Sequence, residues 1–223
     1  MPVNTYRDKI YPFQDKILKT IENLKVDFYL TGGTALSRCY LQHRYSDDLD
    51  LFVNDHPGFK DQCKKLIVAC KQKWHVEIPM SSASFVRLFL EENDMTVKID
   101  FVNDVPYHRG PLERCSIFHK VDNWRNILSN KLCAISRLEA KDLADIVCIA
   151  KNYRFEWEEI INEAREKDLW VDPLEICRLL NTFPLHLLKD IKWIQEIKTS
   201  EMKSLIDVLH DDIFQGKTNS MAI

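Results

Sequence analysis

The sequence predicts an α+β fold, in which a mixed α/β sheet flanked by helices is followed by a helical C-terminal half. Helix-like and strand-like segments alternate as far as about residue 118, and from there on apolar residues recur at helical spacing. We therefore expect an α/β core over residues 1–118 and a helical domain over residues 119–223 that completes a cleft. A cleft between two such halves is a natural ligand site.

The composition is that of an ordinary globular protein, with 223 residues, 45% hydrophobic and 29% charged. The net charge of −3 excludes a globally basic protein, so a nucleic-acid partner would need a local basic patch. The N-terminus is charged throughout and no apolar run approaches the roughly 18 residues of a membrane span. We expect a cytoplasmic protein with no membrane partner.

The seven cysteines form no CxxC pair, and several fall on apolar faces of predicted helices. We expect buried, reduced thiols rather than disulfides or zinc ligands. The seven histidines show no HExxH or paired spacing, so a histidine-based metal site is not expected.

Apolar periodicity predicts the elements of the first half. A first helix runs through residues 6–24, and a turn cluster at 54–58 precedes another helix. A period of two between 74 and 102 indicates strands joined by a hairpin at 92–94. The other expected elements are strands 26–31, 48–53, 85–90 and 95–102 and helices 35–42 and 59–73.

The second half carries only helical patterns and no repeat or low-complexity segment. Its expected helices cover residues 123–136, 140–151, 157–166, 173–181, 185–195 and 200–214.

Two of only five glycines, Gly32 and Gly33, stand side by side directly after an apolar run. A glycine pair that leaves a strand lets the backbone approach a ligand closely. The free N–H groups of a helix that starts next to it form an anion site. A plain turn is the simpler explanation of this pair on its own.

Three aspartates follow in strand-like segments. Asp48 and Asp50 are two residues apart, so both carboxylates project from one strand face. Asp100 interrupts an apolar strand, which is costly unless it is paired, bound to metal or at the strand end. Carboxylates this close favour a bound dication, and Mg²⁺ prefers oxygen ligands. A solvated strand end or loop start would explain each aspartate singly, but the joint order favours a two-metal phosphoryl-transfer site.

The order of Gly32-Gly33, Asp48-Leu49-Asp50 and Asp100 resembles the DNA polymerase beta-like nucleotidyltransferase superfamily. The strings at 31–36 and 43–52 are similar, more narrowly, to the AbiEii/AbiGii toxin family of bacterial nucleotidyltransferases. The resemblance extends over about residues 28–151. It includes a helix with a lysine and an arginine and then an acidic helix, here carrying Lys131, Arg137, Asp142 and Asp145.

The resemblance implies a nucleotidyltransferase that moves an NMP from an NTP to an acceptor hydroxyl and releases pyrophosphate. Mg²⁺ or Mn²⁺ is expected on Asp48, Asp50 and Asp100, and Asp100 would also help to activate the acceptor. Lys131 is expected to contact the triphosphate across the cleft from the glycine turn, with Thr34 or Ser37 as the phosphate-binding hydroxyl. The expected nucleotide-binding residues are Gly32, Gly33, Thr34, Ser37, Arg137, Asp142 and Asp145.

The chain departs from the family pattern in three places. Gly33 stands at the second position of the family's Gly-Ser signature, and Thr34 follows it. The spacing from Gly33 to Asp48 is slightly longer than usual, and Ala144 stands where relatives have an aromatic residue.

By analogy with the family, the acceptor is expected to be tRNA and the partner a cognate antitoxin. The 59–73 helix has a basic surface that would suit RNA, although a solvated helix face is the favoured explanation of these lysines. Transfer to a small molecule or a protein side chain, and a non-catalytic partner-binding protein, are the alternatives. The lysines of this surface are Lys60, Lys64, Lys65, Lys71 and Lys73.

Overall fold

The computed structural model describes residues 5–222, which form two compact units. The first unit comprises the chain up to Cys39 together with Tyr45–Asp122. The second comprises the short segment Tyr40–Arg44 and the chain from Asn123 onward. Within the described residues, no helix combines the length and the apolar character that crossing a membrane requires.

The first unit is built on a mixed sheet, as the sequence predicts. Its described residues form five strands in the order β1-β2-β5-β4-β3. Strands β2 and β5 run parallel, and the other neighbours are antiparallel. The strands are β1 (Tyr29–Thr31), β2 (Leu49–Asn54), β3 (His75–Ser81), β4 (Phe85–Glu92) and β5 (Met95–Asp104).

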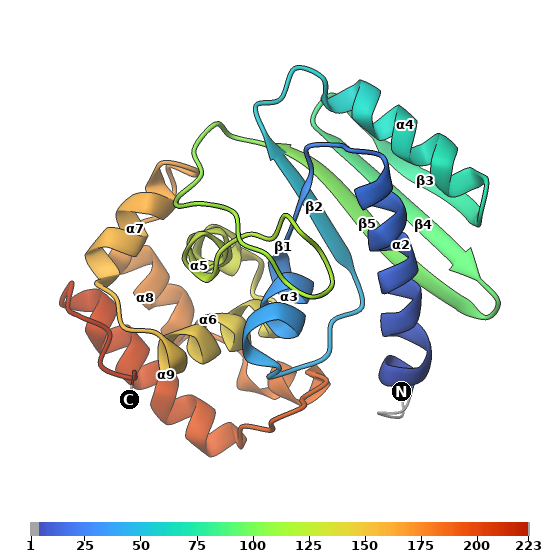
Figure 1. Cartoon of the computed structure of the whole chain (residues 1–223). Coiled ribbons are helices and arrows are strands. Elements are labelled where there is room, and N and C mark those ends of the chain that lie inside the picture. The colour runs from blue at the N-terminus through green and yellow to red at the C-terminus, as the bar shows by residue number, and fades with distance from the viewer. Residues whose placement is uncertain (1–4, 223) are drawn as a thin grey trace. The chain divides into compact units, whose positions relative to one another are not determined.

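One face of this sheet is apolar and packs against the helices α2 (Tyr11–Asn23) and α4 (Phe59–Lys71), which lie on the same side of it (Figure 1). Phe28 contacts both Phe59 of α4 and Phe101 of β5. Alternation along each strand sends the apolar residues to this face and the polar ones to the other. The buried apolar residues of the three central strands are Leu49, Leu51, Val53, Val86, Leu88, Leu90, Val97, Ile99 and Phe101.

The first elements of the chain differ in detail from those that the sequence predicts. The first predicted helix starts as the π-helix η1 (Tyr6–Ile10) before α2. The second begins earlier than expected, as α3 (Gly32–Ala35), and continues as the π-helix η2 (Leu36–Leu41). The strand expected at 26–31 is only Tyr29–Thr31 long. Strand β3 lies at the sheet edge and is mostly exposed, so alternating burial does not mark its limits.

The second unit is helical, and α6 (Ala140–Asn152) forms its centre by packing against α5 and α9. All residues of α6 from Asp142 to Ala150 are buried. Asn123 and Asp172 cap α5 and α8, because each accepts a hydrogen bond from a backbone N–H of the first turn. The other helices are α5 (Trp124–Ala134), η3 (Ile135–Arg137), α7 (Trp157–Arg165), α8 (Pro173–Asn181), η4 (Leu185–Asp190) and α9 (Thr199–Phe214).

The helix expected at 185–195 is present only as the 3₁₀ segment η4. Only Leu188 of that segment is buried, so the segment lacks the apolar stripe that stabilises a longer helix.

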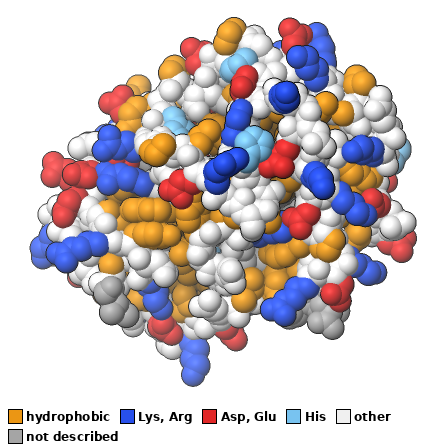
Figure 2. All heavy atoms as spheres, viewed as in Figure 1, with side chains coloured by type: hydrophobic (Ala, Val, Ile, Leu, Met, Phe, Trp, Pro, Cys, Tyr) orange, Lys and Arg blue, Asp and Glu red, His pale blue; other side chains and the backbone are white. Residues whose placement is uncertain are grey.

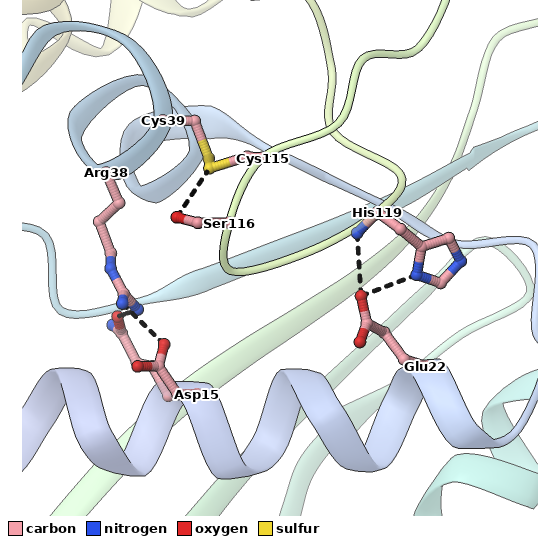
Figure 3. Close-up of a disulfide and its surroundings, with 8 residues drawn as sticks. Asp15, Glu22, Arg38, Cys39, Cys115, Ser116 and His119 are labelled. Atoms are coloured by element: carbon pink, nitrogen blue, oxygen red, sulfur yellow. Dashed lines mark hydrogen bonds and ion pairs between the residues drawn. A yellow bond between two sulfur atoms is a disulfide. The ribbon is translucent and has the colours of Figure 1, made fainter.

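The expectation that no cysteine forms a disulfide is wrong for one pair. Cys39, in η2, is bonded to Cys115, which is 76 residues away in the loop after β5 (Figure 3). The same loop is fastened to α2, because the backbone N–H of His119 donates to Glu22 Oε1 at 2.9 Å. The other five cysteines are free, and four of them are buried.

Cys115→Ser should lower the free energy of unfolding by about 2–4 kcal/mol under oxidising conditions, because the unfolded chain loses a long cross-link. Urea denaturation of both proteins measures this difference. In reductant the two proteins should unfold alike. Denatured, unreduced wild-type protein should titrate as five thiols, and a titre of seven would contradict the disulfide.

Candidate active site

The strand register places the predicted carboxylates together on the polar face of the sheet. Asp50 of β2 lies opposite Thr31 of β1 and opposite Asp100 of β5, and Asp100 lies opposite Arg87 of β4. Residues directly opposite each other in neighbouring strands project from the same face. Asp100 therefore lies beside Asp50 on the polar face, in the strand expected at 95–102, while its chemical role stays a prediction.

Gly32 brings the backbone against the Asp50 carboxylate. Its φ is +67°, and a Cβ at this position would lie 2.3 Å from Asp50 Oδ2. Only glycine combines this conformation with this closeness at low cost. Gly32 thus allows a close approach of the backbone to the carboxylate, directly where α3 begins.

The two hydroxyl groups expected at the phosphate are buried within the protein. The Thr34 hydroxyl donates to the backbone carbonyl of Asp48, and Thr34 is fully buried. Ser37 is also buried and shares a side-chain hydrogen bond with Tyr11. Thr34 therefore ties the start of the helix to the strand that carries the aspartates, and a nucleotide contact of either hydroxyl stays a prediction.

Two cations that the sequence analysis did not select lie among the aspartates. Lys98 Nζ is 2.8 Å from Asp48 Oδ2 and 3.8 Å from Asp100 Oδ2. Arg87 donates two hydrogen bonds to the Asp100 carboxylate, from Nε at 2.7 Å and from Nη2 at 2.8 Å. Lys98 stands two residues before Asp100, so its spacing along β5 was the available signal.

The charges of this group are coupled. The hydrogen bonds that Arg87 donates to the Asp100 carboxylate raise the pKa of Arg87. Burial alone would lower the pKa of Lys98, but the hydrogen bond to Asp48 and the neighbouring carboxylates outweigh it, and the pKa is raised. Three carboxylates and two cations leave a formal charge of −1 on the face formed by Asp48, Asp50, Asp100, Arg87 and Lys98.

The donor set of this face fits Mg²⁺ in its chemistry. Within residues 5–222, no group of three or more His, Cys, Asp or Glu side chains converges to hold a metal ion. Mg²⁺ needs only one or two carboxylates from the protein, because waters and substrate phosphates complete its shell. Asp48 and Asp50 supply such a pair, and the Gly32 backbone lies close to Asp50 Oδ2.

The remaining predicted residues form a second group, within the helical unit. Asp145, whose side chain is fully buried, lies at its centre. Asp145 accepts two hydrogen bonds from Arg44, both at 2.7 Å, and its Oδ2 is 2.7 Å from Lys131 Nζ. Lys131 also donates to Asp142 at 2.7 Å, and Asp142 accepts from the exposed Arg137 at 2.9 Å.

The cations keep this buried group ionised. Burial alone would raise the pKa of Asp145, but Arg44, Lys131 and the hydrogen bonds hold it well below its usual range. Burial likewise opposes the charge of Lys131, and the carboxylates of Asp145 and Asp142 nevertheless raise its pKa. Loss of one partner of such a network leaves an uncompensated buried charge.

His43 and Arg44 are the members of this group that the sequence analysis did not assign to it. His43 Nε2 is 2.7 Å from Asp145 Oδ1, and its buried Nδ1 has no hydrogen-bond partner among residues 5–222. Both residues come from the short segment that belongs to the helical unit. Their place directly before the Asp48 motif does not indicate a partner about a hundred residues away.

Asp145→Asn should lower the free energy of unfolding at pH 7 by about 3–5 kcal/mol, because Lys131 and Arg44 lose a buried counter-charge. The lowered pKa of Asp145 stabilises the fold above the unfolded value of about 3.9, and this contribution is lost as the pH falls through the folded pKa. Urea denaturation from pH 7 to 2 should therefore show a smaller acid-induced loss in the variant. Glu158→Gln, an exposed change in α7, is the control. Equal stability of wild type and Asp145→Asn at pH 7 would contradict the network.

Comparisons with known proteins find the same fold in solved structures. Two crystal structures from Helicobacter pylori share the fold, each at 21% sequence identity and 93% coverage of this chain. One is JHP933, with a TM-score of 0.59 and 95% of its own chain covered. The other is a candidate nucleotidyltransferase, with a TM-score of 0.61 and 97% of its own chain covered. No curated protein sequence matches.

The family assignment rests on nearly the whole chain. Residues 16–221 match the family described as "Nucleotidyl transferase AbiEii toxin, Type IV TA system". This range contains both charged groups and most of each unit. The chain therefore belongs to the AbiEii nucleotidyltransferase toxin family, and it is a nucleotidyltransferase.

Proposed function

We propose that this nucleotidyltransferase moves an NMP from an NTP to an acceptor hydroxyl and releases pyrophosphate in a reaction that depends on Mg²⁺ or Mn²⁺. The observation that carries the proposal is the row of Asp48, Asp50 and Asp100 on one sheet face, with the backbone of Gly32 against Asp50. A phosphate-binding turn next to paired carboxylates suits phosphoryl transfer.

In this reaction the acceptor oxygen forms a bond to the α-phosphorus of the NTP. The bond between the α-phosphorus and the oxygen that bridges it to the β-phosphorus breaks, and this oxygen leaves with the pyrophosphate. Asp48 and Asp50 are the proposed metal ligands, and a bound Mg²⁺ would supply Lewis-acid stabilisation of the α-phosphate. Asp100 accepts the proton of the attacking hydroxyl and passes it to solvent. Gly32 and Gly33 present backbone N–H groups to the β- and γ-phosphates.

The departing pyrophosphate needs a cation, because negative charge develops on it. Lys131 is the proposed cation, and Arg137 is the proposed second contact. Asp142 and Asp145 keep the Lys131 ammonium charged and in a fixed place. Their proposed contribution to nucleotide binding is therefore indirect.

The proposed acceptor is tRNA, and the family description implies a cognate antitoxin as the protein partner. The reaction would take place in the cytoplasm, where tRNA and NTPs occur together. Four of the five lysines of the predicted basic surface lie on α4, and Lys73 follows the end of that helix. All of them except Lys60 are exposed. The ammonium groups of Lys60, Lys64 and Lys73 donate to neighbouring groups. Cationic and anionic side chains are interspersed on the face shown in Figure 2. These observations also suit a small hydroxylated acceptor or a protein side chain, which the same assay can test.

The acceptor test supplies each labelled NTP in turn, with Mg²⁺, to total tRNA, to a mixture of small hydroxylated metabolites and to the protein itself. Label in tRNA, released by nuclease digestion, supports the proposal. Label only in small molecules or in protein would replace tRNA as the acceptor. No transfer to any acceptor would favour a non-catalytic, partner-binding role.

Asp48→Asn and Asp50→Asn should each reduce transfer at least about a thousandfold, because each removes a carboxylate from the proposed metal site. Both variants should fold, since the loss of one carboxylate relieves repulsion within the acidic row. Transfer from labelled NTP gives the activity, and circular dichroism reports the fold. Asp94→Asn, an exposed change in the β4–β5 turn, is the control and should keep full activity. Activity retained in either site variant would rule out the site.

Lys131→Ala should reduce turnover strongly. Lys131→Arg should recover only part of the turnover, because the planar guanidinium of arginine differs in shape from the compact ammonium of lysine. Both variants should be compared by kcat, by KM for the NTP and by urea denaturation. A loss of stability with unchanged kinetics of the folded fraction would assign Lys131 a structural role alone.

A further inference from the structure

We infer that Lys98 is an internal counter-ion that lies between Asp48 and Asp100 when no metal ion is bound, and that metal binding at Asp48 and Asp50 displaces it. Lys98 would then be a positioning residue that sets the affinity of the site for a divalent cation. This inference rests on the metal site of the proposed function.

The first argument is position. Lys98 Nζ is 2.8 Å from Asp48 Oδ2 and 3.8 Å from Asp100 Oδ2, so it lies where a cation shared by these carboxylates would lie. The strand register explains this, because Asp50 pairs with Asp100. Asp48, directly before β2, and Lys98, within β5, each precede that pair by two positions and face the same side. The lysine is therefore built into the same face as the aspartates.

The second argument is charge. With Lys98 and Arg87 in place, the face carries a formal charge of −1, and without Lys98 it would carry −2. The side chains of Lys98 and Asp48 are only 25% and 30% exposed, so solvent screens this group incompletely. An added dication would be repelled by an ammonium at this distance from the same carboxylate. Metal and Lys98 therefore compete for Asp48.

The third argument distinguishes Lys98 from Arg87. Arg87 holds both oxygens of Asp100 in a planar, bidentate pair, which is the stronger and more rigid arrangement. Lys98 makes one close contact through a flexible four-carbon stem. Of the two cations, Lys98 is the one that can leave. Its ammonium would remain on the face where the nucleotide phosphates are proposed to bind.

Mn²⁺ binding to the full-length protein, measured from the loss of the free-ion electron paramagnetic resonance signal, tests this inference without any reaction. Lys98→Met should bind Mn²⁺ about tenfold more tightly than wild type, and Lys98→Arg should bind no more tightly than wild type. Lys16→Met removes a cation that pairs with Glu92, an acidic residue outside the aspartate group, and should leave Mn²⁺ affinity unchanged. Lys98→Gln provides a second neutral variant if the methionine variant does not fold.

Thermal unfolding gives an independent readout. Without metal, Lys98→Met should unfold at a lower temperature than wild type, and saturating Mn²⁺ should raise its Tm by more than it raises that of wild type. Unchanged or weaker Mn²⁺ binding in both neutral variants would overturn the inference.

The failure of the counter-ion and the failure of the metal site give different results. If Asp48→Asn weakens Mn²⁺ binding but neither neutral Lys98 variant tightens it, only the proposed counter-ion role of Lys98 is wrong. If Asp48→Asn and Asp50→Asn leave Mn²⁺ binding unchanged, the metal site of the proposed function is wrong, and the counter-ion with it.

Discussion

The parallel pairing of β2 with β5 is the constraint on which the candidate site depends. These strands are distant in sequence, and their register places Asp50 opposite Asp100. Leu49 and Ile99, one position earlier, are both fully buried on the other face. A slip of one residue in either strand would turn its acidic residues into the apolar core, so burial of the leucines and isoleucines holds the acidic row in place.

The two charged groups of the protein both pair carboxylates with cations, but at different depths. Around Asp145 the carboxylates and cations are buried together, so each partner is expensive to remove. Around Asp48 the groups are partly exposed, and an ion can exchange there at lower cost. The first arrangement suits a fixed support, whereas the second suits a site that binds and releases a charged ligand.

Contacts at the start of the helix after β1 fix the position of the glycine turn relative to Asp48 and Asp50. Gly32 touches the Asp50 carboxylate, and the Thr34 hydroxyl donates to the backbone of Asp48. Thr31 donates to the buried Asp122 at 2.7 Å. Any ligand on the glycine turn would therefore be held in a defined position relative to both carboxylates, which is what in-line transfer requires.

The sequence by itself determined the α+β class, most helices and strands, the strand faces of Asp48 and Asp50, and the order of motifs that indicates the family. These features are local, because periodicity and short spacings encode them directly. Only the tertiary structure decided which cations neutralise which carboxylates. Lys98 with Asp48, His43 and Arg44 with Asp145, and Cys39 with Cys115 are pairs of residues 50 to 102 positions apart. Such pairs arise from strand register and helix packing, and no local pattern of residues records them.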